Sequence, residues 1–437
     1  MQALVKFTLL TFLLVGTMGN LFAQNESIIV VNGGIYGVTN ANTTIEALNS
    51  GVATNMGTIG TSSIQDVLVD SQYVYVAAQD SIVKYNWMTK NRVAANAFGG
   101  ESTLSLALHN NHLLVGNWYG PWGATGPYNR HFLIYDANDL SLIDSIPQVT
   151  KPADDFVVIG DYAYIAQNND KTVGFGDTLG YLAVVDLTTM TLVRNDTLST
   201  TGEEIGRLVV EGDMIYAING ASNTISSYNT VTLAKSTQPA ANGLDLKPAA
   251  YGPTAFTKGA GVWYFPYDSG IGSYDLANNA VIAANMVNIA GSFAFVLDTF
   301  NNTFCVSHIN YSDQLQNKGR IYDMNGDSVG MFQVEYSPEA LAIVSDILVS
   351  STLQVAKSNE LMYSISPNPA TTTLAVNFEK AEAVTLVVLN QVGQNVLTKQ
   401  STDTAVVLDV AELTAGVYFL AVVSEDGIMR TQRFVKQ

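Results

Sequence analysis

The chain has 437 residues, 47% of them hydrophobic, which is ample for packed cores and excludes wholesale disorder; at about 150 residues per domain, two or three domains are expected. With 20 Lys and Arg against 38 Asp and Glu, the net charge of −18 argues against duplex nucleic acid or an anionic membrane as the main partner. The single cysteine, Cys305, excludes an intramolecular disulfide framework, and the 4 histidines leave little room for a histidine-built metal centre.

The N-terminus has the features of an export signal. Lys6 precedes a run of apolar and small residues over 7–19, and cleavage is expected after Ala23. This run is too short to span a bilayer, and no later apolar segment reaches the length of about 18 residues that spanning requires, so no transmembrane anchor is expected. We therefore predict that residues 1–23 are a signal peptide and that the mature protein passes through the periplasm.

Residues 24–350 contain a repeated pattern. Each unit has an apolar strand, a tight polar turn and a second apolar strand, followed by a third strand such as 132–136 and a more polar fourth such as 140–145. Six such units begin at Asp66, Leu104, Asp155, Gly206, Thr254 and Phe293. Four strands in every 40 to 50 residues are typical of a β-propeller.

The two ends of this region complement each other. Residues 339–344 have the pattern of a first strand without a second, and residues 28–31 that of a second strand without a first. Joining them completes a seventh unit and removes an exposed sheet edge. We therefore predict an all-β fold with a seven-bladed β-propeller over residues 24–350; a series of β-sandwiches is the alternative.

Two of the repeats carry a further pattern. Residues 155–166 (DFVVIGDYAYIA) and 209–217 (VVEGDMIYA) approach Val-x-Gly-Asp-x-x-Tyr-Val-Ala, and the Gly-His and Trp-Asp signature of WD40 repeats is absent. In these residues the region resembles the YVTN-like and surface-layer propellers of secreted bacterial proteins. The resemblance implies a fold and no particular ligand, because what that family binds is diverse.

Candidate ligand-binding residues lie in the connections between second and third strands, which in a propeller emerge on the same face as the connections between blades. The longest, 116–131 (GNWYGPWGATGPYNRH), holds aromatic rings that can stack on a sugar face or on apolar peptide. They are Trp118, Tyr119, Trp122 and Tyr128. The connection over 167–180 adds the amides of Asn168 and Asn169. The alternative for the aromatic rings is that they pack the loop onto its neighbours.

Motifs for catalysis or metal binding are absent: there is no Gly-x-Ser-x-Gly, no His-Glu-x-x-His and no phosphate-binding loop. We therefore expect no catalytic residues, no metal and no cofactor, and predict a binding protein for a glycan, peptide or surface polymer. Charged residues near the first strands keep a polysaccharide hydrolase or lyase open as an alternative, because glycoside hydrolysis needs paired carboxylates. They are Glu101, Lys151, Asp154, Glu203, Glu204 and Glu339. Carboxylates that converge with Arg or His at the channel mouth would favour the enzyme, and a large flat apolar patch would favour a structural surface-layer component.

The C-terminal region has a different texture. Residues 351–362 form a polar linker, and period-two alternation from residue 363 onward predicts a small Ig-like β-sandwich over 363–437. Its ordered motif residues are Pro367, Asn368, Pro369, Gly393, Gly416, Tyr418, Gly427 and Lys436. In these residues the region resembles the type A C-terminal sorting domain of the type IX secretion system of Bacteroidota. The resemblance implies the type IX machinery as a partner and a secreted or outer-cell-surface location.

Overall fold

The computed structural model describes the chain from residue 26 onward, and the predicted signal peptide lies outside the described part. The described residues are 26–35, 38–48, 50–61, 63–97, 103–118, 128–167, 180–199, 205–219, 222–241, 257–259, 262–267, 270–289, 291–299, 301–313, 316–345, 363–378, 383–390, 395–424 and 429–437. They form an all-β protein in which the strands are arranged mostly in four-stranded antiparallel sheets. In this part of the chain no helix is long and apolar enough to cross a membrane.

Seven four-stranded sheets follow one another between residues 26 and 345, and six of them are built in simple chain order. Sheet 2 is β4 (Ile64–Val69), β5 (Tyr73–Ala78), β6 (Ser81–Asn86) and β7 (Asn91–Ala97); sheet 3 is β8 (Thr103–His109), β9 (His112–Asn117), β10 (Phe132–Asp136) and β11 (Leu142–Ser145). Sheet 4 is β12 (Ala153–Ile159), β13 (Tyr162–Gln167), β14 (Gly180–Asp186) and β15 (Thr191–Ser199); sheet 5 is β16 (Ile205–Glu211), β17 (Met214–Asn219), β18 (Thr224–Asn229) and β19 (Lys235–Pro239). Sheet 6 is β20 (Thr257–Gly259), β21 (Val262–Tyr267), β22 (Gly270–Asp275) and β23 (Ala280–Asn288); sheet 7 is β24 (Ser292–Asp298), β25 (Thr303–Ile309), β26 (Lys318–Asp323) and β27 (Ser328–Phe332).

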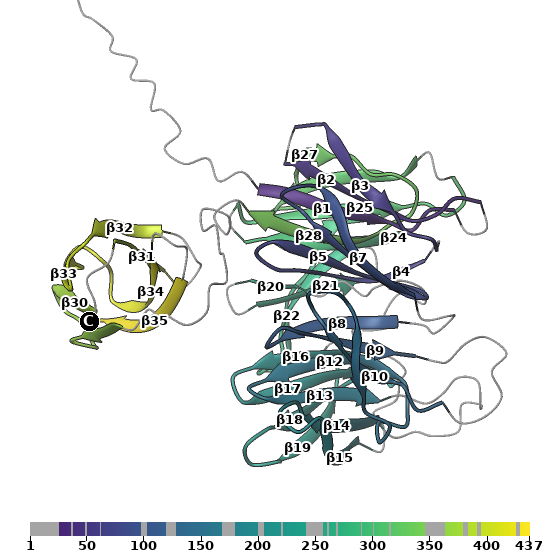
Figure 1. The fold of residues 1–437 in the computed structure, drawn as a ribbon, viewed down its shortest axis with the longest axis horizontal. Helices are drawn as coiled ribbons and strands as arrows, with labels where there is room; N and C mark the ends of the chain where they lie inside the picture. The colour runs from purple at the N-terminus through teal and green to yellow at the C-terminus, as the bar shows by residue number, and fades with distance from the viewer. Residues whose placement is uncertain are drawn as a thin grey trace, which may run out of the picture.

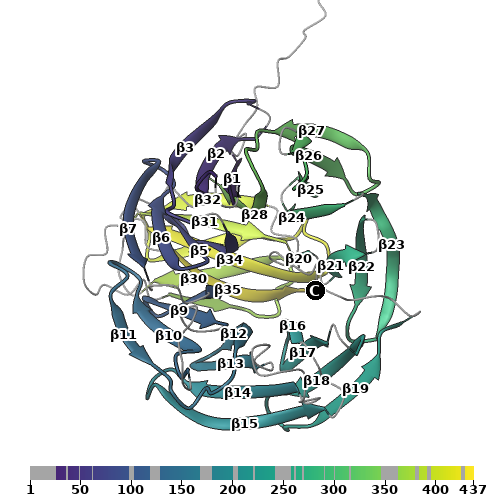
Figure 2. The same ribbon diagram turned by 90° about the vertical axis from the view of Figure 1, so that its right-hand side faces the viewer.

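Sheet 1 joins the two ends of this region. Its order is β28 (Pro338–Ser345), β1 (Glu26–Asn32), β2 (Asn42–Ala47) and β3 (Ala53–Thr58), so β1 pairs with β28 on one side and with β2 on the other. Figure 2 shows the seven sheets side by side around a ring, with the fourth strands, such as β15 and β23, at the periphery. The pairing of β1 with β28 closes this ring with backbone hydrogen bonds.

The core lies between neighbouring sheets. Side chains on both faces of second strands such as β5, β9 and β13 are covered, and these strands are mostly apolar. Between sheets 3 and 4, for example, Phe132 packs edge-on against Phe156 with ring centroids 5.0 Å apart. The fourth strands have an exposed face, which carries both polar and apolar residues. Hydrophobic burial between sheets is therefore the main force that holds the ring together.

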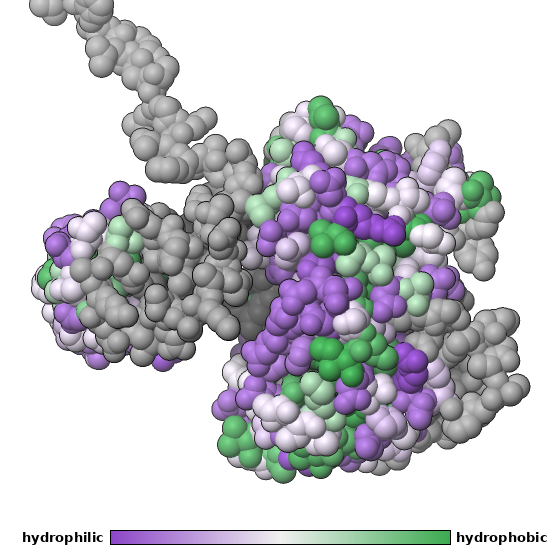
Figure 3. Space-filling view, viewed as in Figure 1, coloured by the Kyte–Doolittle hydropathy of each residue, from purple (hydrophilic) through white to green (hydrophobic). Residues whose placement is uncertain are grey.

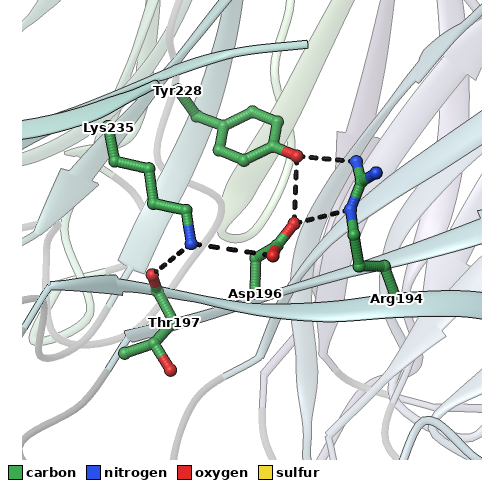
Figure 4. A network of polar contacts seen from close by, with 5 residues as sticks. All are labelled: Arg194, Asp196, Thr197, Tyr228 and Lys235. Carbon is green, nitrogen blue, oxygen red and sulfur yellow. Dashed lines mark hydrogen bonds and ion pairs between the residues drawn. The ribbon is translucent and has the colours of Figure 1, made fainter. Parts of the chain in front are cut away.

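Sheets 4 and 5 are also joined by a polar network between their outer strands (Figure 4). Asp196 on β15 accepts hydrogen bonds from Arg194 Nε at 2.8 Å and from the Tyr228 hydroxyl at 2.9 Å. Arg194 Nη2 donates to the same Tyr228 oxygen at 2.7 Å, and Lys235 of β19 donates to the Thr197 carbonyl at 2.9 Å. The network is partly buried, so its hydrogen bonds are shielded from water more than those of an exposed ion pair.

Residues 363–437 form two further sheets, drawn in yellow and yellow-green in Figure 1. One is β29 (Tyr363–Ser366), β30 (Thr373–Phe378) and β33 (Ala405–Asp409); the other is β32 (Asn395–Ser401), β31 (Val384–Leu389), β34 (Gly416–Ser424) and β35 (Met429–Lys436). Both sheets contribute to one core, in which Leu374, Leu386 and Leu420 are fully buried. The alternating burial of β31 and β33 agrees with the predicted period-two pattern.

Candidate functional site

One edge of each sheet carries the connections in which ligand-binding residues are predicted from the sequence. There the second strand ends opposite the start of the first strand: Asn117 pairs with Thr103 in sheet 3, and Gln167 pairs with Ala153 in sheet 4. We call this side the loop edge. The two longest connections from second to third strands, 118–131 and 168–179, leave from the loop edges of these adjacent sheets.

The structure covers only some of the sequence-predicted ligand residues. Trp118 and Tyr128 are described, and both are partly exposed. Tyr119, Trp122, Asn168 and Asn169 lie outside the described residues. Their part in a ligand site therefore stays a prediction.

The base of the sheet 3 connection is anchored by Asn117. This buried amide donates through Nδ2 to the Tyr128 hydroxyl at 3.3 Å and to the Arg130 carbonyl at 3.1 Å. The Tyr128 ring stands edge-on to His131, with centroids 4.8 Å apart. The two ends of the connection are thus tied together, and Tyr128 is held with part of its ring accessible.

At the seam between sheets 3 and 4, the two sheets approach each other closely beside Gly116. A Cβ atom at this position would lie 2.6 Å from the Ala153 carbonyl oxygen and 2.6 Å from Ser105 Oγ, so the contact requires glycine. Gln167 belongs to the same seam, because its partner Ala153 and the alternate residues of β13, Ala163 and Ile165, pack against sheet 3.

The seam contains buried polar atoms without hydrogen-bond partners among the described residues. Both amide atoms of Gln167 are in this state, as is Ser105 Oγ; Asn117 Oδ1, on the opposite face of sheet 3, is a further such atom. Gln167 and Asn117 are fully buried, and Ser105 is 3% exposed. Each unsatisfied buried group costs about 1–3 kcal/mol, and such groups in native proteins are rare enough to indicate a role or a bound partner.

A cation and an aromatic ring flank the sheet 4 side of the seam. Lys151 Nζ lies 4.5 Å from the centroid of the Tyr181 ring, and both side chains are partly exposed. Lys151 precedes β12, and Tyr181 is the second residue of β14, so both lie at the loop edge. The attraction between an ammonium group and a ring face orients both groups there.

Sequence reasoning missed a repeated amide at the loop edge. Asn32, Asn117, Gln167 and Asn219 each end the second strand of their sheet, and all are fully buried. In sheet 1 the amide has a clear structural use, since Asn32 Oδ1 accepts the backbone N–H of Glu335 at 2.9 Å. The recurring Asn or Gln after an apolar strand was visible in the sequence and could have been found from the repeat alignment.

A second polar set lies where the inner strands begin. The pairing of β4, β8, β12 and β16 with their second strands shifts by one residue near the start. The residues directly after the shift are equivalent in the four sheets, and they are Asp66, Ser105, Asp155 and Arg207. Because the first strand is the inner strand of each sheet, these residues lie near the loop-edge ends of the strands closest to the centre of the ring.

The two aspartates of this set, Asp66 and Asp155, each connect their own sheet to the next one. Asp66 Oδ2 accepts the Leu106 N–H at 2.9 Å, and Asp155 Oδ2 accepts the Leu208 N–H at 2.7 Å. Arg207 Nη1 lies 3.3 Å from Asp155 Oδ1. Burial raises the pKa of Asp66 to about 6, while the Arg207 charge opposes this shift and the Asp155 charge adds to it.

Glu339 has a similar place in sheet 1. Its Oε2 accepts the Ile64 N–H of sheet 2 at 2.9 Å, and burial raises its pKa to about 7. Of the other charged residues considered from the sequence, Lys151 and Asp154 also lie near the start of an inner strand, whereas Glu101, Glu203 and Glu204 are outside the described residues. Within the described part of the chain, no group of three or more His, Cys, Asp or Glu side chains is arranged to hold a metal ion.

The C-terminal motif residues act mainly on the last strand. Asn368 Oδ1 accepts the Val435 N–H at 2.9 Å, and Asn368 Nδ2 donates to the Arg433 carbonyl at 3.3 Å. The flanking Pro367 and Pro369 both follow cis peptide bonds. The motif thus fastens the start of this region to β35, close to the C-terminus.

The other motif residues support the same end of the sandwich. The Tyr418 hydroxyl donates to the Thr414 carbonyl at 2.9 Å, and its ring stacks on Phe434 with centroids 5.7 Å apart. Lys436 is buried, and Gly416 begins β34. Gly393 and Gly427 lie outside the described residues.

Comparison with protein families identifies this region. Residues 364–437 match the family described as the secretion system C-terminal sorting domain. The match confirms that the region is a type IX sorting domain, and it confirms export to the cell surface by the type IX machinery. No match to a curated protein sequence was found.

Solved structures with a similar trace share little sequence with this chain. The extracellular domain of the putative one component system BT4673 from B. thetaiotaomicron is 10% identical, with a TM-score of 0.44, covering 94% of this chain and 57% of that one. PorZ, a surface component of the type IX secretion system of Porphyromonas gingivalis, is 11% identical with a TM-score of 0.44, covering 94% and 58%. BamB from Moraxella catarrhalis is 10% identical with a TM-score of 0.38, covering 80% and 95%. The chain thus spans little more than half of the first two proteins.

Proposed function

We propose that residues 24–350 form a seven-bladed β-propeller that binds an extracellular glycan at the loop edge of sheets 3 and 4. Residues 1–23 direct it to the periplasm as a signal peptide, 351–362 link it to the next domain, and the Ig-like sandwich over 363–437 carries it across the outer membrane. The seven consecutive four-stranded sheets and the pairing of β1 with β28 support the blade count, because together they account for every strand among the described residues of the region.

One observation supports the binding site most directly. Partly exposed Trp118 and Tyr128 beside sheet 3, and Tyr181 with Lys151 in sheet 4, lie at the loop edge, where the two longest second-to-third connections begin. Below them lies the buried amide of Gln167, which has no hydrogen-bond partner in the described part of the chain. Rings above unused hydrogen-bonding groups suit a ligand with apolar faces and many hydroxyls, which is the chemistry of a carbohydrate.

A glycan array with the full mature chain tests this proposal. Trp118→Ala and Tyr181→Ala should each weaken binding by about 1–3 kcal/mol, which is roughly 5- to 150-fold, as the loss of a stacking ring does. Tyr162→Ala is the matched control: this ring is 41% exposed and begins β13, at the opposite edge of sheet 4, so binding should not change. Unchanged binding in both ring variants, or a large fall in melting temperature, would show instead that the rings only pack the fold.

A second candidate function is favoured by the convergence of Asp66, Asp155 and Arg207 at the channel mouth, the arrangement expected of a polysaccharide-cleaving enzyme. In each aspartate, however, a carboxylate oxygen already accepts a backbone N–H of a neighbouring sheet. Incubating the bound glycan with the protein and measuring new reducing ends distinguishes the two functions. A binding protein releases none.

The surface-layer alternative predicts a continuous apolar patch. Exposed apolar residues do occur on the fourth strands, but they are distributed over several sheets: Val93, Leu142, Ile143, Val193, Ile282, Val329 and Met331. On the face in Figure 3, hydrophobic areas are likewise separated by hydrophilic ones. This distribution supports a displayed binding protein over a lattice component.

A further inference from the structure

Asp66 and Asp155 are equivalent residues in equivalent surroundings. Each directly follows the pairing shift near the start of an inner strand. Each also accepts the N–H of the equivalent leucine in the next sheet, Leu106 for Asp66 and Leu208 for Asp155. The fold therefore builds the same carboxylate position twice, in sheets 2 and 4.

The two positions differ in the residue that directly follows the pairing shift in the next sheet. Beside Asp155 this residue is Arg207, whose guanidinium lies 3.3 Å from the carboxylate. In sheet 3 the residue equivalent to Arg207 is Ser105, which has no charge; its buried hydroxyl, on the side of sheet 3 that faces sheet 4, has no hydrogen-bond partner in the described structure. Sheet 3 thus supplies no arginine to Asp66; the Arg207 charge that acts on Asp66 comes from sheet 5, where this guanidinium pairs with Asp155.

Asp66 remains partly exposed at the channel mouth, and no described side chain forms an ion pair with it. We infer that Asp66 is a receptor for a guanidinium group of an extracellular ligand, the side chain of an arginine in a peptide, which takes the place that Arg207 takes beside Asp155. The site goes beyond the proposed glycan function and does not depend on it.

The chemistry of the site favours an organic cation over a metal ion. Asp66 Oδ1 accepts the Val67 N–H and Oδ2 the Leu106 N–H, both at 2.9 Å, so each oxygen keeps a free lone-pair direction. Two parallel N–H donors of a guanidinium match this pair of oxygens. A metal ion would need further ligands, and the described residues contain no cluster of three metal-ligating side chains.

The charged groups that face Asp66 are Arg207 and Asp155, and Arg207 is already engaged by Asp155. Only the ionised form of Asp66 attracts a guanidinium. Because the pKa of Asp66 is raised to about 6 by burial, binding should strengthen as pH rises from 5 to 7.

Calorimetric titration of the full mature chain with N-acetylarginine N-methylamide tests the inference, with the citrulline analogue as the neutral probe of the same shape. The arginine probe should bind at least tenfold more tightly. Asp66→Asn, which keeps an acceptor for an N–H, should lower its affinity at least tenfold, whereas Asp186→Asn, which removes an exposed turn carboxylate, should not. Ser105→Arg should also abolish binding, because a resident guanidinium then competes for Asp66.

Equal affinity for the two probes, or unchanged arginine binding in a folded Asp66→Asn variant, overturns the inference. Circular dichroism of each variant establishes that it is folded. If Ser105→Arg does not fold beside Gly116, the Asp66→Asn comparison decides alone.

Discussion

Replacing Gln167 by methionine should stabilise the protein. Methionine has one side-chain heavy atom fewer than glutamine but a similar length and volume, and Gln167 is fully buried in the seam between sheets 3 and 4. In the described structure neither amide atom of Gln167 has a hydrogen-bond partner. Methionine fills the same space with flexible apolar atoms, so the substitution removes two unsatisfied polar groups without creating a cavity.

The size of the effect follows from the desolvation of the amide. A buried unsatisfied donor or acceptor costs about 1–3 kcal/mol. We expect Gln167→Met to raise the free energy of unfolding by about 1–3 kcal/mol, with the gain at the lower end because the thioether packs less specifically than a fitted core residue. Glycan binding should weaken in the same variant if the amide serves the ligand, a trade of stability against function.

Urea unfolding of the full mature chain, followed by tryptophan fluorescence, measures the change. Gln65→Met is the matched control, since Gln65 is partly exposed and its amide donates to Ser63 Oγ at 2.9 Å. The control should stay within about 0.5 kcal/mol of wild type. A destabilisation of more than 1 kcal/mol by Gln167→Met would refute the reasoning, because it would mean that the amide makes favourable interactions.

Three other predictions concern stability. Burial raises the pKa of Glu339 to about 7, and burial together with the Asp298 carboxyl raises the pKa of Glu26 to about 8. The folded state therefore binds more protons than the unfolded state between pH 4.5 and 8. The melting temperature should fall as pH rises through this range, and it should fall less steeply in Glu339→Gln. Asp196→Ala leaves Arg194 and Tyr228 without their shared acceptor. It should lower the free energy of unfolding, measured in urea, by about 1–3 kcal/mol, which is more than Asp196→Asn should. Equal stability of wild type and Asp196→Ala would show that the network contributes nothing. Asn368→Ala removes two hydrogen bonds to β35 and should lower the stability of the C-terminal sandwich by about 1–2 kcal/mol in calorimetry, whereas Asn377→Ala, at an exposed site on β30, should have no effect.

The strands were predictable because their patterns are local. Apolar runs ending at turn residues such as Asn110, Gly160 and Gly212, which all have positive φ, mark the first and second strands of sheets 3, 4 and 5. The leftover runs at 28–31 and 339–344 pair as expected within β1 and β28. The turn at Asn325 and Gly326 and the burial of Cys305 also follow the sequence pattern.

The polar contacts at the channel mouth could not be predicted in the same way. Asp155 and Leu208 lie 53 residues apart, and their contact depends on a one-residue pairing shift that no local pattern specifies. A polar residue near the start of an otherwise apolar inner strand, as at Asp66 and Arg207, was the available signal. For the ligand loops the prediction stays open, because Trp122 and Asn168 are outside the described residues.

Cell fractionation tests the central claim, which is that the C-terminal domain carries a folded binding domain to the outside of the cell. The full chain and a chain lacking residues 363–437 would be expressed in the native host and located by immunoblot in periplasm, outer membrane and medium. We predict that the full chain reaches the surface or medium, and that the shortened chain stays in the periplasm as a protease-resistant protein. Shortened protein outside the cell at the level of the full chain would contradict the account.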